Sequence, residues 1–86
     1  MSNNNSKPVT FGEFKKVIAD ALVVDEEMLQ PETSFIGDLF VDSLRLVEMA
    51  LRIEQLGVKI PSTAYWDIQT VGQAYDAYVE YTNHKE

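Results

Sequence analysis

The sequence of 86 residues contains no cysteine, which excludes both a disulfide scaffold and a thiolate metal site. A domain of this size must then be held together by the packing of its apolar side chains. The chain also has no apolar run long enough to cross a bilayer, and Met1 to Lys7 lack the apolar segment of a signal peptide. We therefore expect a cytoplasmic protein that has no membrane partner.

Basic residues are few, with seven Lys and Arg against 14 Asp and Glu, for a formal charge of -7. No base lies between Lys16 and Arg45, and that interval contains the acids Asp20, Asp25, Glu26, Glu27, Glu32, Asp38 and Asp42. A surface of this charge repels nucleic acid and attracts basic protein surfaces. We expect no nucleic-acid partner, although the same acids would also serve to keep a small domain soluble.

Groups suited to catalysis are equally scarce. His84 is the only histidine and lies close to the C-terminus, where a partner base or a shared metal site is difficult to organise, so we expect a solvated tail residue. Glu26 and Glu27 are too exposed in pattern to acquire the shifted pKa values of acid/base catalysis. No glycine-rich phosphate loop or calcium-binding loop is present. One small core also leaves little room for a catalytic cleft, so we expect a non-catalytic protein without a metal.

Two capping boxes predict where two helices begin. They are Thr10-Phe11-Gly12-Glu13 and Thr70-Val71-Gly72-Gln73, in which the first and last side chains satisfy each other's unpaired backbone N–H groups. Apolar residues recur at helical spacing behind each box. They are Phe11, Phe14, Val17, Ile18, Ala21 and Leu22 behind the first, and Val71, Ala74, Tyr75, Tyr78 and Val79 behind the second.

A further helix is predicted from Asp42 or Ser43 to Leu56, because Asp is a preferred N-cap and Gly57 is a typical stop. Its core face is expected to contain Leu46, Met49, Ala50, Ile53 and Leu56. Its solvent-exposed face is expected to contain Arg45, Glu48, Arg52 and Gln55. Between these faces lies a second apolar stripe formed by Leu44, Val47 and Leu51. A surface helix does not need this stripe merely to dock, so the stripe must contact something else.

The remaining segments complete an all-α prediction. From Val23 to Val41 we expect a long loop with at most a short turn, held to the core by Met28, Leu29, Phe35, Ile36 and Leu39. Residues 62–68 are predicted to form one or two helical turns that carry Tyr65 and Trp66. The expected fold is a small four-helix bundle with a long loop between its first two helices and a short third helix. Residues 1–9 are assigned to a flexible N-terminal tail, 10–82 to the domain and 83–86 to a C-terminal tail.

One segment resembles a known family. It reads Thr33-Ser34-Phe35-Ile36-Gly37-Asp38-Leu39-Phe40-Val41-Asp42-Ser43-Leu44, and Val47-Glu48 and Gly57-Val58-Lys59-Ile60-Pro61 follow it. This pattern is similar to that of the acyl carrier proteins and the related peptidyl carrier (thiolation) domains, whose hallmark is an Asp-Ser-Leu triplet at the start of the second helix. The resemblance covers about Phe11 to Tyr81 and includes the Thr-Val opening of the last helix. It implies the four-helix bundle of the acyl carrier protein type.

The resemblance implies that Ser43 is esterified by a phosphopantetheinyl transferase, which takes 4'-phosphopantetheine from coenzyme A. The thiol of this arm would hold acyl or aminoacyl intermediates as thioesters, and the partners would be an acyl- or aminoacyl-loading enzyme and downstream synthase enzymes. The position suits a phosphodiester, because the first turn of a helix offers free N–H groups and a positive dipole end. Asp42 would cap the helix and assist recognition by the transferase. The alternative is that Asp42 and Ser43 are only helix-capping residues.

The resemblance also assigns a use to the surplus apolar stripe. Leu44, Val47 and Glu48 match positions that face partner enzymes in the family, and Leu51 and Arg45 extend this partner-binding surface. The stripe would form an apolar strip for partners or one wall of an acyl pocket. In the alternative, the short third helix and the loop cover it. We expect the carrier to act as a monomer.

Several positions depart from the family pattern. Phe40 stands where the family usually has Gly, and it is expected to shield the arm or to fill a gap under the loop. Arg45 stands where fatty-acid carriers commonly have an acid, and Tyr65 and Trp66 replace residues that are usually acidic there. These departures favour a carrier of polyketide, nonribosomal-peptide or hybrid natural-product biosynthesis. The alternatives are a carrier of fatty-acid synthesis and a carrier-fold interaction module that lacks the arm.

Overall fold

The structure, a computed structural model, describes residues 8–83 of the chain. Its helical segments are α1 (Phe11–Leu22), the short 3-10 helix η1 (Glu26–Met28), α2 (Ser43–Glu54), α3 (Ser62–Tyr65) and α4 (Val71–Asn83). Within residues 8–83 the only strand-like pairing is an isolated antiparallel bridge between Ser34 and Thr70. The prediction of an all-α fold with a long loop before its second α-helix and a short third one is confirmed.

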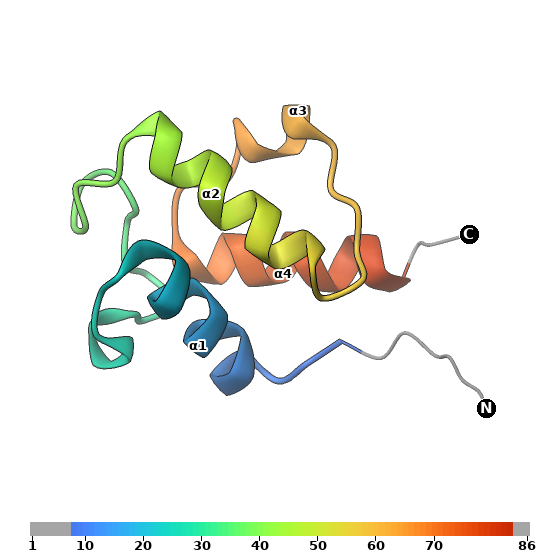
Figure 1. The fold of residues 1–86 in the computed structure, drawn as a ribbon, viewed down its shortest axis with the longest axis horizontal. Helices are drawn as coiled ribbons and strands as arrows, with labels where there is room; N and C mark the ends of the chain where they lie inside the picture. Colours follow the sequence, from blue (N-terminus) through green and yellow to red (C-terminus); the bar gives the residue numbers. More distant parts are fainter. Residues whose placement is uncertain (1–7, 84–86) are drawn as a thin grey trace.

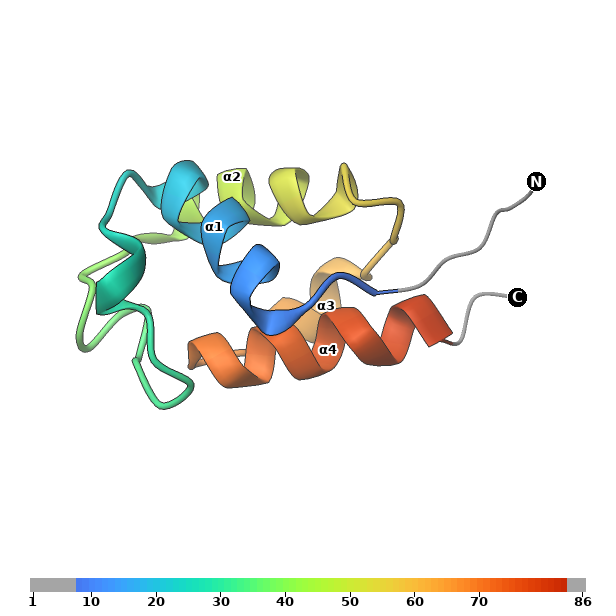
Figure 2. The same cartoon turned by 90° about the horizontal axis from the view of Figure 1, so that it is seen from below.

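The helices form two layers around one core. Helix α1 packs against both α2 and α4. Figure 1 shows α2 crossing the molecule diagonally, and Figure 2 shows α4 running along the opposite side from α1 and α2, with α3 between α2 and α4. The largest fully buried side chains come from these helices and from the long loop: Tyr78, Phe14, Phe35, Ile18, Leu29, Met49, Ile53 and Val71. Each such side chain contributes roughly 1.5–3 kcal/mol when it leaves water.

The predicted capping residues begin α1 and α4. Thr10 Oγ1 accepts a hydrogen bond from Glu13 N–H at 3.2 Å. At α4 the box is reciprocal, because Gln73 N–H donates to Thr70 Oγ1 and Thr70 N–H donates to Gln73 Oε1, each at 3.2 Å. The predicted reciprocal box is therefore confirmed at α4, whereas at α1 only the bond to Thr10 Oγ1 is formed.

Helix α2 ends two residues earlier than predicted, at Glu54 instead of Leu56. The chain tightens there, since Leu56 N–H donates to Ile53 O at 2.9 Å and Gly57 N–H donates to Glu54 O at 3.0 Å. These bonds span three residues, so the last turn is of the 3-10 type. Gly57 follows with φ of 97°, a conformation that favours glycine. On the predicted core face, Met49 and Ile53 are buried, and Leu46 and Leu56 pack partly buried against the core.

The long loop is fixed to the start of α4 by backbone hydrogen bonds. Phe35 N–H donates to Gln69 O at 2.9 Å, Val71 N–H to Thr33 O at 3.0 Å and Gly72 N–H to Pro31 O at 2.8 Å. Leu29 and Phe35 are buried as predicted. Met28 and Ile36 are exposed, so the prediction that they hold the loop to the core is wrong. Backbone bonds to the start of α4 and to Gln69 just before it fix this loop in addition to its buried side chains.

The ends of the described range bear on the predicted tails. Val9 N–H donates to Tyr78 Oη and Tyr75 Oη donates to Val9 O, both at 2.8 Å, so the chain contacts α4 before α1 begins. Asn83 still belongs to α4. Residues 1–7 and 84–86 of the two predicted tails, which include His84, lie outside the described residues. Within residues 8–83, the longest apolar helical stretch falls short of what a bilayer crossing requires.

Candidate functional site

Ser43 is the first residue of α2 and is exposed. The loop before it is held by Val41 N–H, which donates to Phe35 O at 2.9 Å. Asp42 then adopts an extended conformation as N-cap, and its Oδ1 accepts a hydrogen bond from Arg45 N–H at 2.9 Å. Within residues 8–83 the N–H groups of Ser43 and Leu44 have no hydrogen-bond acceptor. A hydroxyl therefore stands beside two free backbone donors at the positive end of a helix dipole.

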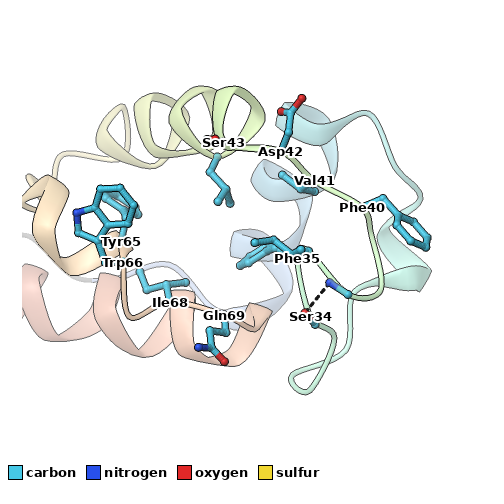
Figure 3. A pocket seen from close by; sticks show the side chains of 13 residues that line it. Ser34, Phe35, Phe40, Val41, Asp42, Ser43, Tyr65, Trp66, Ile68 and Gln69 are labelled. Carbon is cyan, nitrogen blue, oxygen red and sulfur yellow. Dashed lines mark hydrogen bonds between the residues drawn. The ribbon is translucent and has the colours of Figure 1, made fainter.

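Ser43 lies at the edge of a groove of about 840 Å³ between α2, the long loop and the segment from α3 to α4. Figure 3 shows Phe35 and Ile68 facing this hollow, with Tyr65 and Trp66 at one end and Val41 near Ser43. We call it the loop groove. Its lining residues are Ser34, Phe35, Ile36, Gly37, Phe40, Val41, Asp42, Ser43, Leu46, Tyr65, Trp66, Ile68 and Gln69.

A second hollow of about 320 Å³ lies between α2 and α3, and we call it the helix groove. Ser43, Leu46, Tyr65 and Trp66 line both grooves. The other residues of the helix groove are Val47, Ala50, Leu51, Glu54 and Ile60. Ser43 thus stands where two mainly apolar hollows meet, so a flexible group attached there could lie in either one.

The predicted apolar stripe on α2 is uncovered. Leu44, Val47 and Leu51 each remain more than half exposed, so the alternative that α3 and the loop cover them is wrong. Val47 and Leu51 line the helix groove, whereas Leu44 lines neither groove. The stripe is available both as a groove wall and as a surface for a partner.

The two arginines of α2 are engaged with α1. Arg45 Nη1 donates to Leu22 O at 3.1 Å, and Arg52 Nη1 forms an ion pair with Asp20 Oδ2 at 2.6 Å. Helix α1 has no basic residue in its own last turn, so Arg45 supplies a cation to the negative end of its dipole. We did not predict this role from the sequence. The absence of a base and of a glycine at the end of the first predicted helix was the available signal.

The hydroxyl of Tyr65 is buried without a hydrogen-bond partner in the described structure. Burial, and secondarily the negative charge of Glu54, raises the pKa of Tyr65 from its ordinary value of 10.0 to about 12. The group therefore remains a protonated donor at neutral pH, at the boundary between the two grooves. The sequence places Tyr65 on the short third helix and marks it as a departure from the family pattern, but it gives no sign that the hydroxyl is buried.

Phe40 adopts a left-handed conformation with φ of 56° and is 85% exposed. Figure 3 shows its ring pointing away from the loop groove. The expectation that it fills a gap under the loop is wrong, because an exposed ring fills no gap. Glycine would adopt this backbone conformation without strain, which gives a physical reason for the glycine usual at this position in the family.

The described residues offer no metal site, since no cluster of three or more His, Asp or Glu side chains lies within ligating reach among residues 8–83. Asp42 and Glu48 are exposed on α2. The surroundings of Ser43 thus combine an exposed hydroxyl, two mainly apolar hollows and exposed acidic side chains.

Comparison with known proteins agrees with this arrangement. A family model described as a phosphopantetheine attachment site matches residues 13–77. The chain is 38% identical over 73 residues to an acyl carrier protein of Picosynechococcus, which covers 84% of this chain and 90% of that protein. It is 43% identical over 68 residues to an acyl carrier protein of Rubrobacter xylanophilus, and this match covers 78% of this chain and 84% of that protein. An acyl carrier protein of Clostridium perfringens is 37% identical over 73 residues, and this match covers 84% of this chain and 96% of that protein.

Proposed function

Because the chain belongs to the acyl carrier protein family, we propose that Ser43 Oγ is the atom to which its 4'-phosphopantetheine group is attached. Members of this family are carriers and not enzymes, and 4'-phosphopantetheine is the prosthetic group that they hold. The observation that carries the proposal is the exposed hydroxyl at the first residue of α2, directly after the Asp42 cap.

The residues present fit the group. Two N–H groups, of Ser43 and Leu44, lack acceptors within residues 8–83 and can donate to phosphodiester oxygens at the positive end of the helix dipole. The apolar walls of the two grooves can contact uncharged parts of the arm and cargo. When bound, the group supplies a thiol that holds an acyl or aminoacyl cargo as a thioester.

In the attachment step, Ser43 Oγ forms a bond to the pantetheine-linked phosphorus of coenzyme A. The pyrophosphate bond breaks, adenosine 3',5'-bisphosphate leaves, and the hydroxyl proton passes to a base of the phosphopantetheinyl transferase. Asp42 supports this step by fixing the first turn through its bond to Arg45 N–H at 2.9 Å. An exposed loop-to-helix junction gives another enzyme's active site access to the oxygen.

The surface for partner enzymes is proposed to include Leu44, Val47, Glu48, Leu51 and Arg45. The uncovered stripe on α2 supports the apolar part of this surface, since patches of this kind mark sites of protein contact. The Arg45 side chain is directed toward α1, because it donates a hydrogen bond to Leu22 O. A partner enzyme would contact Arg45 in this orientation.

The pathway is proposed to be polyketide, nonribosomal-peptide or hybrid natural-product biosynthesis, in the cytoplasm where coenzyme A is supplied. Trp66, which is 82% exposed and lines both grooves together with Ser43, supports a dedicated partner set because exposed aromatic side chains often anchor specific protein interfaces. The test is loading of the modified protein by the malonyl transferase of fatty-acid synthesis. Loading as fast as that enzyme's own carrier would favour fatty-acid synthesis instead.

The attachment proposal is tested by intact-mass spectrometry. Incubation with coenzyme A and a broad-specificity phosphopantetheinyl transferase is expected to add the mass of one phosphopantetheine to the wild type and none to Ser43→Ala. Ser34→Ala is the matched control, because Ser34 also lines the loop groove but its hydroxyl accepts from Gly37 N–H at 2.9 Å. It should gain the same mass as the wild type. No gain in the folded wild type would leave the interaction module without an arm as the better interpretation.

A further inference from the structure

Phe40 combines a strained backbone conformation with an exposed ring. Its φ of 56° lies in a region that bulky side chains rarely adopt. The loop imposes this conformation, since Leu39 N–H donates to Ser34 O at 3.1 Å and Val41 N–H donates to Phe35 O at 2.9 Å on either side of it. The ring is 85% exposed, so core packing does not offset the strain.

We propose that the ring of Phe40 is an anchor for the enzyme that modifies Ser43, the phosphopantetheinyl transferase. This inference rests on the proposed attachment at Ser43. Strained residues persist most often at functional sites, and exposed aromatic side chains are the residues that most often dominate the energy of protein interfaces. Phe40 is both strained and exposed, and it lies three residues before Ser43 at the border of the loop groove, with its ring turned outward.

Distance favours the transferase over later enzymes. Three residues of chain span at most about 11 Å, whereas an interface of about 800 Å² per partner has a radius of about 16 Å if it is round. The transferase must bring its active site to Ser43 Oγ itself, so it covers Phe40. Enzymes that act on the cargo work at the thiol on the far end of the arm and can remain further away.

Charge defines the chemistry of the contact face. Asp38 and Asp42 are exposed two residues before and two residues after Phe40, and Glu48 is exposed on α2. Arg45 and Arg52 are instead bonded to α1. The surface that fits is therefore an apolar recess bordered by Lys and Arg side chains. Phe40 would fill the recess, and the acids would meet the basic border.

The test measures kcat and KM for modification of the apo protein by a broad-specificity phosphopantetheinyl transferase with coenzyme A. Phe40→Gly is expected to raise the KM for the carrier about tenfold, as loss of an interface anchor does. Phe40→Tyr keeps the ring and should restore a KM close to that of the wild type. The thermal midpoint of Phe40→Gly should not fall, because glycine relieves the strain. Phe40→Asn, which also tolerates the left-handed region, should raise the KM as Phe40→Gly does.

Val23→Gly is the matched control. Val23 also has a positive φ, of 58°, and is 81% exposed, but it lines neither groove that contains Ser43. This variant should keep the wild-type KM. A wild-type KM in Phe40→Gly, or an equal rise in Val23→Gly, overturns the role of Phe40 while leaving the attachment proposal intact. Failure of the wild type itself to be modified overturns the attachment proposal instead.

Discussion

At the scale of single residues, two glycines at the second position of their helices are predicted to respond in opposite ways to alanine. A Cβ atom on Gly72 would lie 2.8 Å from Pro31 O, whereas one on Gly12 would meet nothing closer than Thr10 Oγ1 at 3.9 Å. Gly72→Ala should lower the free energy of unfolding by about 1–3 kcal/mol, because the added methyl group would push α4 and the loop apart. Gly12→Ala should raise it by about 0.5–1 kcal/mol. Urea unfolding checks both, and an unchanged midpoint in Gly72→Ala would mean that the loop yields easily.

The raised pKa of Tyr65 makes a second prediction at this scale. The pKa of the Tyr65 hydroxyl is about 12 in the folded state and 10.0 in the unfolded state. The unfolded state therefore loses this proton first as pH rises. The contribution of Tyr65 is complete below pH 10 and is lost between there and pH 12. Urea midpoints measured at both ends of this window should fall less in Tyr65→Phe than in the wild type. Equal falls would show that the hydroxyl is not responsible.

At neutral pH the same variant should be as stable as the wild type or slightly more so. The hydroxyl that it removes is buried without a partner, and removing an unsatisfied polar group costs little. A clear loss of stability would indicate that the hydroxyl has a partner in solution.

At the scale of elements, the bond between α2 and the end of α1 gives a third prediction. Arg45→Met keeps most of the side-chain length but removes the donor to Leu22 O, so it should lower the free energy of unfolding by about 0.5–1 kcal/mol. Arg52→Met breaks only the exposed ion pair with Asp20, so it should change the free energy of unfolding by less than about 0.5 kcal/mol. Chemical unfolding separates the two, and an equal loss in both would contradict a capping role for Arg45.

The starts of the helices could be predicted from their caps, and the loop expected from Val23 agrees with the end of α1 at Leu22. The physical cause of that end, and the early end of α2, could not be predicted. A start is encoded by a cap beside it in the chain, as at Thr10, Asp42 and Thr70. The end of α1 instead depends on Arg45, 23 residues further along, and Val23 adopts there a left-handed conformation that residue preferences assign to glycine. Helix α2 ends early in a 3-10 turn that no residue before Gly57 signals. Ends of this kind are set by tertiary contacts, which local patterns do not contain.

At the scale of the whole molecule, the position of the candidate site was predictable because it depends on one short motif. Ser43 was placed at the start of a helix, on an exposed junction, by the residues around it alone. The two grooves and the buried hydroxyl of Tyr65 were not foreseen, since they arise where α2, α3 and the loop meet in space. The backbone bonds that hold the loop to the start of α4 could not be predicted either, because almost any residue can donate such bonds.

The charge of -7 makes a last prediction for the molecule as a whole. Among residues 8–83 the only ion pair is that of Arg52 with Asp20, so most acids on this surface repel one another without compensation. Salt shortens the Debye length from about 10 Å at about 0.1 M to about 3 Å at about 1 M, which screens this repulsion more than it weakens a single exposed pair. The thermal midpoint should therefore rise with sodium chloride. A midpoint that falls would mean that attractive pairs dominate the electrostatics, and the acidic surround proposed to attract basic partners would then be largely neutralised within the protein itself.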